Sequence, residues 1–421
     1  MTTPQTVDTT PQLPREVWVL VAGAFLVALG FGLVAPVLPT YASSFGVSAA
    51  GVSVIISAFA FTRLIFAPVA GRLLKRLPER PIYLAGLLIV AASSVGIAYA
   101  PGYAGLLIAR SLGGVGSTMF TIAGLALLFR VTPPELRGRA SAAYGSGFLI
   151  GSIGGPLFGG LLVGWSVKAP FLIYAVILVI TAVLVQLLLR RIPPPVLGDA
   201  APVATLGETL RERPYQAVLA SNFAVGWAVF GIRMALFPLF IVQVLGASEA
   251  VAGYALTAFA IGNALVLALV GRWVDIRGRK PAMIIGLVLS SATLGLIGVS
   301  ASVWMVMVLC VIGGVGSGMM TPAQQAVVAD VLRGRSGGPV LALYQMMGDL
   351  GSVVGPILAG VLVDSNGYPI AFGIGAVVVA ATVLLWLRAP ETLPARAAAG
   401  KMAGNTTPSP RRWIGGRMNR S

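Results

Sequence analysis

Twelve apolar stretches, each close to the length of a bilayer-spanning helix, limit most strongly what this chain can fold into. A helix needs about 20 apolar residues to cross the hydrocarbon core, where no water is present to satisfy the backbone. We predict an all-α integral membrane protein whose transmembrane helices cover residues 17–39, 51–71, 81–100, 104–129, 139–165, 169–190, 216–242, 250–271, 281–300, 303–330, 338–363 and 369–388.

The composition excludes a water-soluble protein and the common enzyme classes. Hydrophobic residues make up 57% of the chain and charged residues only 10%, whereas an average soluble domain is about 25% charged. The chain has no His and one cysteine, Cys310. These counts exclude His-based acid–base chemistry, an intrachain disulfide and a His- or Cys-rich metal site. The sequence patterns of common hydrolases and of nucleotide-binding loops are also absent. We therefore expect neither an enzyme nor a bound cofactor or metal.

The sequence partly repeats itself at an offset of 200 residues. The segment 113–117 recurs as 313–317, and the glycines and proline of 151–156 recur as 351–356. Because six spans return the chain to its starting side, the repeat predicts two pseudo-symmetric six-helix bundles in parallel orientation, with a cavity between them. The expected division is a disordered N-terminus (1–15), a first bundle (16–190), a central loop (191–215), a second bundle (216–390) and a disordered basic tail (391–421).

The cations predict the orientation of the chain. If the N-terminus is cytoplasmic, every Lys and Arg outside the predicted spans lies on the cytoplasmic side except Lys168. This asymmetry is the one that the positive-inside rule describes. We therefore expect a multi-pass protein of the plasma (inner) membrane with both termini in the cytoplasm. The net charge of +16 then suits contact with anionic membrane lipid and not with nucleic acid.

Short charged loops follow the second and eighth predicted spans. In the second copy, Gly271 lets two helices touch, Gly278 permits a tight turn, and Asp275 can accept hydrogen bonds from an arginine or a helix N-terminus. The first copy differs, because Lys75 replaces the acid and Pro78 replaces the turn glycine. The simpler interpretation of both loops is that their cations only fix the topology.

The fourth predicted span contains an arginine, Arg110, at some depth in the bilayer. Together with Gly114, Ser117 and Thr121, it forms one polar stripe at helical spacing. A cation within a span costs about 2.5–3.5 kcal/mol on insertion scales, so we expect it to face the bundle interior. The alternative is that its side chain reaches the outer interface. The equivalent residue of the second half is Cys310, so the charge is specific to the first half.

The fifth predicted span has a dense pattern of glycines around one proline. It reads GSIGGPLFGG from residue 151. Glycines four residues apart leave a flat groove for a neighbouring helix, and the proline frees a carbonyl and bends the helix. We expect a close helix contact here, and ordinary small-residue packing is the alternative. The residues of this predicted seam are Gly151, Gly155, Pro156, Gly159 and Gly160.

These motifs resemble those of the major facilitator superfamily of transporters, most closely its twelve-span drug:proton antiporter branch. The resemblance covers residues 15–390 and implies the fold of that superfamily. It implies a role in proton coupling for Arg110, and it marks the glycine-rich seam as typical of antiporters. It also implies that the charged loops act as a conformational latch, through Gly71, Arg72, Arg76, Gly271, Asp275, Arg277, Gly278 and Arg279.

Acids within the predicted spans are scarce. Asp349 is the only one near mid-membrane, and Asp330 and Asp364 lie at span ends, where water or headgroups can solvate them. A buried carboxyl group whose surroundings change can bind a proton in one conformation and release it in another. We therefore predict that Asp349 is the proton site, on a polar stripe with Gln345 and Ser352. The predicted electrostatic partners are Arg110, Arg63 and Arg233; a purely structural Asp–Arg pair is the alternative.

The resemblance also implies that the first, fourth, seventh and tenth spans line a substrate cavity. Aromatic, thioether and amide side chains on these spans suit amphipathic ligands, although they suit ordinary packing equally well. The candidates are Phe31, Met119, Asn222, Phe230, Gln324 and Gln325. Three intramembrane arginines against one aspartate indicate a net positive cavity, which suits anionic or neutral substrates.

We predict a secondary active transporter that exports a small amphipathic, drug-like compound in exchange for protons by rocker-switch alternating access. The alternative is an exporter or uniporter of a metabolite or organic anion that protons do not drive. The expected partners are a small-molecule substrate, protons and membrane lipid, and we expect a monomer.

Overall fold

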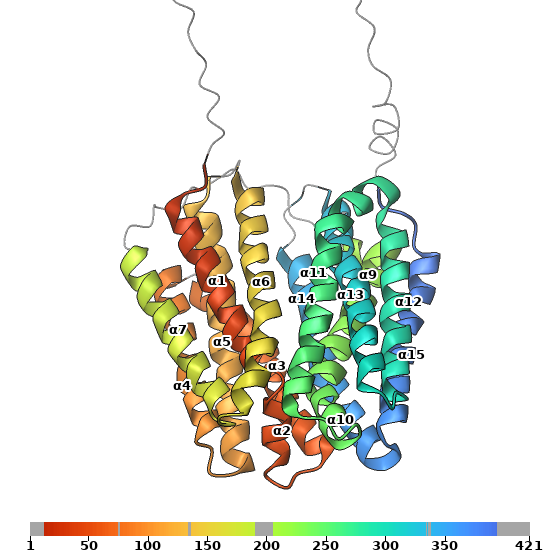
Figure 1. Ribbon diagram of the computed structural model, residues 1–421. Coiled ribbons are helices and arrows are strands. Elements are labelled where there is room, and N and C mark those ends of the chain that lie inside the picture. Colours follow the sequence, from red (N-terminus) through yellow and green to blue (C-terminus); the bar gives the residue numbers. More distant parts are fainter. Residues whose placement is uncertain are drawn as a thin grey trace, which may run out of the picture.

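The structure is a computed structural model that describes residues 12–74, 76–133, 136–189, 205–333, 335 and 338–393. Within these residues every regular element is a helix (Figure 1). Twelve helical stretches of the described chain are long and apolar enough to cross a membrane, which confirms the predicted number. The elements are α1 (Arg15–Val34), α2 (Leu38–Ser43), α3 (Ala49–Leu74), α4 (Glu79–Ala98), α5 (Tyr103–Val131), α6 (Arg137–Val163), α7 (Ala169–Leu188), α8 (Leu206–Arg211), α9 (Arg213–Val225), η2 (Gly226–Arg233), α10 (Phe237–Gln243), α11 (Glu249–Arg277), α12 (Arg279–Gly298), α13 (Val303–Leu332), α14 (Gly338–Asn366) and α15 (Tyr368–Arg388).

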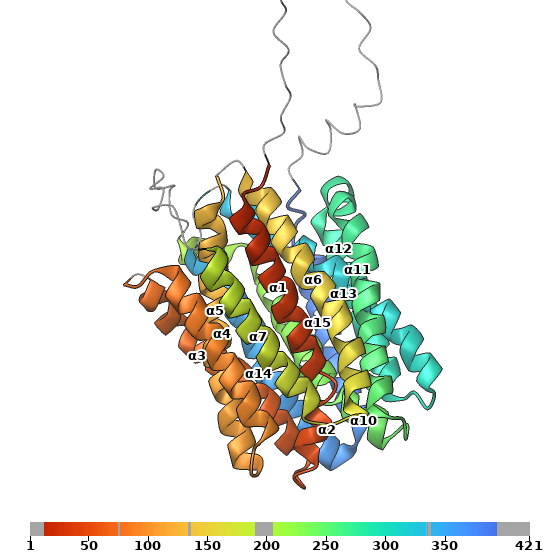
Figure 2. The same cartoon turned by 60° about the vertical axis from the view of Figure 1, so that its left-hand side comes forward.

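The two halves of the chain form the same bundle twice. In the first half α5 packs on α3 and α4, α4 packs on α7, and α1 packs on α6. In the second half α13 packs on α11 and α12, α12 packs on α15, and α14 packs on α9 and η2. The register also repeats, because α4 begins at Glu79 and α12 at Arg279, while α5 begins at Tyr103 and α13 at Val303. The predicted pseudo-symmetric bundles are therefore present, and the axes of their helices lie roughly along one common axis (Figure 2).

Two of the predicted spans are interrupted. The span predicted at 17–39 is two helices, because α1 ends at Val34 and the following turn contains Pro36, which has no N–H to continue the helix. The span predicted at 216–242 is divided into α9, a π-helical segment η2 and α10. π-helical turns are rare and occur frequently at functional sites. The short helices that follow the two interruptions, α2 and α10, contact each other across the two halves.

The two faces of the molecule differ in how closely the bundles approach. We name the face where α1 begins and α15 ends the terminal face, and the face that contains α2 and α10 the opposite face (top and bottom of Figure 1). Near the opposite face the backbones of α6 and α11 touch: a Cβ on Gly160 would lie 3.0 Å from the carbonyl oxygen of Ala250. Toward the terminal face the bundles diverge in Figure 1, and a Cβ on Gly71, Gly145 or Gly338 would meet no atom within 4 Å.

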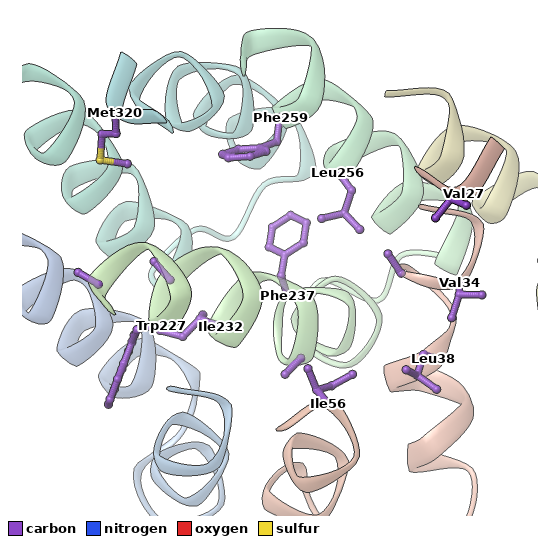
Figure 3. Packing of buried hydrophobic residues seen from close by; sticks show 14 of the residues in the cluster. Val27, Val34, Leu38, Ile56, Trp227, Ile232, Phe237, Leu256, Phe259 and Met320 are labelled. Carbon is purple, nitrogen blue, oxygen red and sulfur yellow. The ribbon is translucent and has the colours of Figure 1, made fainter. Parts of the chain in front are cut away.

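Apolar side chains fill the space between the bundles near the opposite face. Val34, Leu38 and Ile56 come from the first half, and Phe237 and Leu256 come from the second; all five are buried in one hydrophobic cluster (Figure 3). Because both bundles contribute to this cluster, apolar side chains join the two bundles at this face.

Candidate transport site

A cavity of about 170 Å³ lies between the two bundles, midway along their spans. Its walls come from α1, α3 and α5 of the first half and from α9, η2 and α14 of the second. Phe31 and Phe59 contribute aromatic surface, and their ring centroids are 6.1 Å apart. The cavity is therefore mostly apolar, with polar groups from Arg63, Arg110, Asn222, Gln345, Asp349 and Ser352.

The structure brings Asp349 together with one of its three predicted partners. Nη2 of Arg63 lies 3.9 Å from Oδ1 of Asp349, and both side chains are partly exposed to the cavity. Arg63 also donates a hydrogen bond from Nη1 to the Ser117 hydroxyl, at 3.1 Å. Since Arg63 is on α3 and Asp349 on α14, this ion pair joins the two halves. The predicted polar stripe on α14 also faces the cavity, because Gln345 and Ser352 line it too.

The other two arginines are buried against equivalent aromatic rings. The guanidinium carbon of Arg110 lies 4.1 Å from the ring centroid of Phe59, and that of Arg233 lies 3.5 Å from that of Phe259. Such cation–π contacts partly compensate a desolvated cation. Nε of Arg110 and Nη1 of Arg233 have no hydrogen-bond partner among the described residues. Arg110 is 8% exposed and lines the cavity, so it faces the interior and does not reach the outer interface; Arg233 is outside the cavity wall.

The glycine-rich seam is a close contact between α6 and α1 within the first half. A Cβ on Gly151 would lie 2.9 Å from the amide nitrogen of Leu29, and one on Gly155 would lie 2.6 Å from the Leu29 carbonyl oxygen. Gly159 is equally close to Leu33. Gly160 is different, because it faces α11 of the other half. The carbonyl group of Pro156, one turn earlier, also faces α11. The seam thus positions α1, which carries part of the cavity wall.

The charged loop of the second half is held by contacts within that half. Gly278 has φ of 107°, a conformation that favours glycine, as predicted from its turn position. Nε of Arg279 lies 3.1 Å from Oδ2 of Asp330, and the Glu391 carboxylate accepts hydrogen bonds from the backbone N–H groups of Arg279 and Lys280. Glu391 therefore caps the N-terminus of α12, where a carboxylate is favourable.

In the first half, the equivalent positions carry the same ion pair with its charges reversed. Glu79 bonds to Arg130 there, whereas Arg279 bonds to Asp330 in the second half. The predicted latch residues do not all come together: Arg277 lies 5.9 Å from the Trp273 ring centroid, and the side chains at positions 271 and 275 are outside the described residues. Arg72 and Arg76 lie near the end of α3, and Arg76 is exposed. The latch role of these loops stays a prediction.

The predicted substrate residues divide into two groups. Phe31 and Asn222 line the cavity. Met119 packs against Gly86 between α5 and α4, and Gln324, which is 2% exposed, donates a hydrogen bond to Ser221 at 3.1 Å.

Met119, Gln324 and Gln325 therefore do not line this cavity, and the side chain of Phe230 is outside the described residues. The helical pattern groups residues on one face without showing which face meets the cavity. Sequence reasoning missed Phe59, although its recurrence as Phe259 was a usable signal.

Comparison with known proteins identifies the family. The model of the Major Facilitator Superfamily matches residues 20–235 and again residues 218–415. The chain belongs to the major facilitator superfamily. It is thus a multi-pass membrane transporter of small molecules and not an enzyme. The first match covers the first bundle and extends into the second, and the second match covers most of the second bundle.

Curated relatives and solved structures within the superfamily match over nearly the whole chain. Multidrug resistance protein 1 of Bacillus subtilis (strain 168) is 27% identical over 388 residues, covering 90% of this chain and 97% of the relative. Quinolone resistance protein NorA of Staphylococcus aureus (strain MRSA252) is 26% identical, covering 88% and 96%.

Among solved structures, an inward-facing, unoccupied bacterial homologue of the human lysosomal transporter Spinster has a TM-score of 0.69 at 18% identity, covering 95% of this chain and 100% of that one. The human organic anion transporter MFSD10 has a TM-score of 0.63 at 20% identity, covering 89% and 100%. At these identities, the two structures show the fold that this chain shares with them.

Proposed function

We propose that this transporter exports a small amphipathic, drug-like compound in exchange for protons by alternating access. Two relatives that match over most of their length are named for multidrug and quinolone resistance. The cavity supports such a substrate, because aromatic walls with a few polar groups suit amphipathic ligands. Two rigid bundles around a central cavity can expose it to one side of the membrane at a time.

We further propose that the terminal face is cytoplasmic and that the protein resides in the plasma membrane. The support is the distribution of Lys and Arg, which favours that side. In this orientation the bundles meet at the extracellular side and diverge toward the cytoplasm. The conformation described above then corresponds to an inward-facing state, in which cytoplasmic substrate can enter.

The observation that carries proton coupling is the ion pair between Arg63 and Asp349 in the cavity wall. Because its members belong to different halves, a rocking of the bundles that separates α3 from α14 changes the distance between guanidinium and carboxylate. The proton affinity of a carboxyl group depends on whether a cation is near and on how well water reaches it. A conformational change that alters this pair therefore couples protonation of Asp349 to the state of the transporter.

A second candidate function is transport of an organic anion, which the charge of the cavity favours. Arg63 and Arg110 outnumber Asp349 in the cavity wall, and the pairing of Arg63 with Asp349 leaves Arg110 to receive an anionic group. The two candidates differ in their relation to protons. A cationic substrate competes with the proton for Asp349 and is exchanged for it, whereas an anionic substrate does not compete with it.

The test is transport by the purified full-length protein in proteoliposomes with an imposed pH gradient. Matched aromatic dyes that differ only in charge serve as probes. We expect gradient-driven accumulation of a cationic or neutral dye that reverses when the gradient is reversed. Gradient-independent movement of only the anionic dye would instead favour the second candidate.

The same assay tests Asp349 directly. Asp349→Asn should abolish accumulation driven by the pH gradient but retain dye-for-dye exchange without a gradient, because the cavity keeps its shape. Asp349→Glu, which retains the carboxyl group, should keep part of the driven transport. Undiminished gradient-driven transport by Asp349→Asn would remove this residue from proton coupling.

A further inference from the structure

At the opposite face, one carboxylate of the second half caps a helix of the first half. Oδ1 of Asp364 accepts a hydrogen bond from the backbone N–H of Ala49 at 2.9 Å, and Oδ2 accepts one from Ala50 at 3.0 Å. Ala49 and Ala50 begin α3, while Asp364 lies in the last turn of α14. The first N–H groups of a helix have no partner within the helix and carry partial positive charge. Asp364 satisfies two of them across the boundary between the halves.

The helix contact beneath this cap is tight. Gly360 lies one turn before Asp364, and a Cβ there would be 2.5 Å from Oγ of Ser53 and 2.8 Å from the Ala49 carbonyl oxygen. Farther along, the Ser57 hydroxyl donates to the Val353 carbonyl oxygen at 2.8 Å. The absence of a side chain at Gly360 therefore lets α14 approach α3 closely enough for the carboxylate to reach the helix end.

Among the described residues, a side-chain cap of this kind is found at the start of α3 and not at the start of α11. The equivalent of Asp364 in the first half is Gly164, which has no side chain to cap α11. The equivalent contact, between α6 and α11, is made by backbone against backbone at Gly160 and Ala250. Since α3–α14 and α6–α11 are the main helix pairs that join the halves, the charged contact distinguishes one pair from the other.

We propose that Asp364 of α14, hydrogen-bonded to the first turn of α3, is a polar clasp. It holds the opposite face closed and sets the balance between the two conformations of the transporter. The inference rests on the proposed alternating access, because the clasp must open when the cavity opens to this face. Opening separates the carboxylate from the two N–H groups, and only water can then accept their hydrogen bonds. Loss of an N-cap typically shifts a helix equilibrium by about two- to thirtyfold, so the clasp is strong enough to bias the cycle without blocking it.

Spin-label distance measurements in lipid nanodiscs test the clasp without reference to any substrate. The single native cysteine is first removed as Cys310→Ser. One label pair, at Ser44 and Val244, then reports the separation of the halves at the opposite face. A second pair, at Ser141 and Leu341, reports it toward the terminal face. All four label sites are exposed, and each pair joins equivalent positions of the two halves.

Asp364→Ala should increase the ratio of molecules open at the opposite face to closed ones about tenfold, equivalent to about 1.4 kcal/mol. The second pair should show the matching closure, and Asp364→Asn should have a smaller effect because it keeps one acceptor oxygen. Glu249→Ala is the matched control, since Glu249 is an acid in the first turn of α11 at the same face. It should leave both distances unchanged.

Gly360→Leu separates failure of the clasp from failure of alternating access. Its side chain would wedge α14 away from α3, so it should open the opposite face whatever Asp364 does. If the wedge opens this face but Asp364→Ala does not, or if Glu249→Ala opens it equally, the clasp is refuted and alternating access stands. If the wedge changes neither distance, the proposed alternating access is wrong and the clasp is refuted with it.

Discussion

Replacing Gly155 by alanine should separate α6 from α1 and destabilise the first bundle. The added Cβ would lie 2.5 Å from Cα of Gly32 and 2.6 Å from the carbonyl oxygen of Leu29. Carbon atoms in ordinary contact are about 3.5–4.0 Å apart, so the helices must part by roughly 1 Å. Because both neighbours are backbone atoms, no side chain can rotate to relieve the contact.

The magnitude follows from two opposing effects. Overpacking a well-packed interior costs about 1–3 kcal/mol, and contact with rigid backbone places this variant near the upper limit. Alanine gains up to about 1 kcal/mol over glycine in helix propensity. The expected net loss in the free energy of unfolding is therefore about 2 kcal/mol. Gly145, on the same helix, has no atom within 4 Å of its Cβ position, so Gly145→Ala should gain up to about 1 kcal/mol.

The assay is thermal unfolding of both variants in one detergent, followed by intrinsic fluorescence. The same substitution in the same helix should lower the midpoint at Gly155 and leave it unchanged or raised at Gly145. A midpoint for Gly155→Ala at or above that of the wild type would refute the reasoning. An equal loss in both variants would show that the effect does not arise from the contact with α1.

Two further stability predictions use the same unfolding assay. Reversing the first-half pair as Glu79→Arg with Arg130→Asp should recover most of the stability, about 1–3 kcal/mol, that each single variant loses. The reason is that Arg279 and Asp330 already form the reversed pair in the second half; a double variant no more stable than the single variants would contradict the equivalence. Gly278→Ala should cost about 1–3 kcal/mol, because φ of 107° is strained for any residue with a side chain, and an unchanged midpoint would contradict this.

Part of the candidate site was predictable because burying a charge is costly. A charged side chain within an apolar span must face the interior, so the sequence predicts that Arg110 faces the bundle interior and that Asp349 is the proton site, and both residues line the cavity. The choice among three arginine partners was not predictable, because pairing depends on the distance between helices of different halves. Arg63 is beside Asp349, whereas Arg233 packs on Phe259 outside the cavity wall.

Asp364 shows the opposite case. At the end of a span it is exposed, as expected, and it also caps α3, which lies more than 300 residues away in the chain. Helix periodicity also did not predict the π-helical segment η2 in the seventh span. Such features arise from contacts between distant segments, and local pattern contains no information about them.

The sequence by itself determined the membrane environment, the number of spans, the duplicated architecture and the family. These follow from hydropathy, period and repeat, because a bilayer permits few ways to satisfy a backbone. Only the tertiary structure decided which arginine pairs with Asp349 and which amides and aromatic rings reach the cavity. It also decided at which face of the molecule the two bundles meet. Those outcomes depend on the rotation and spacing of each helix against its neighbours, which close glycine contacts such as that between Gly155 and Gly32 help to set.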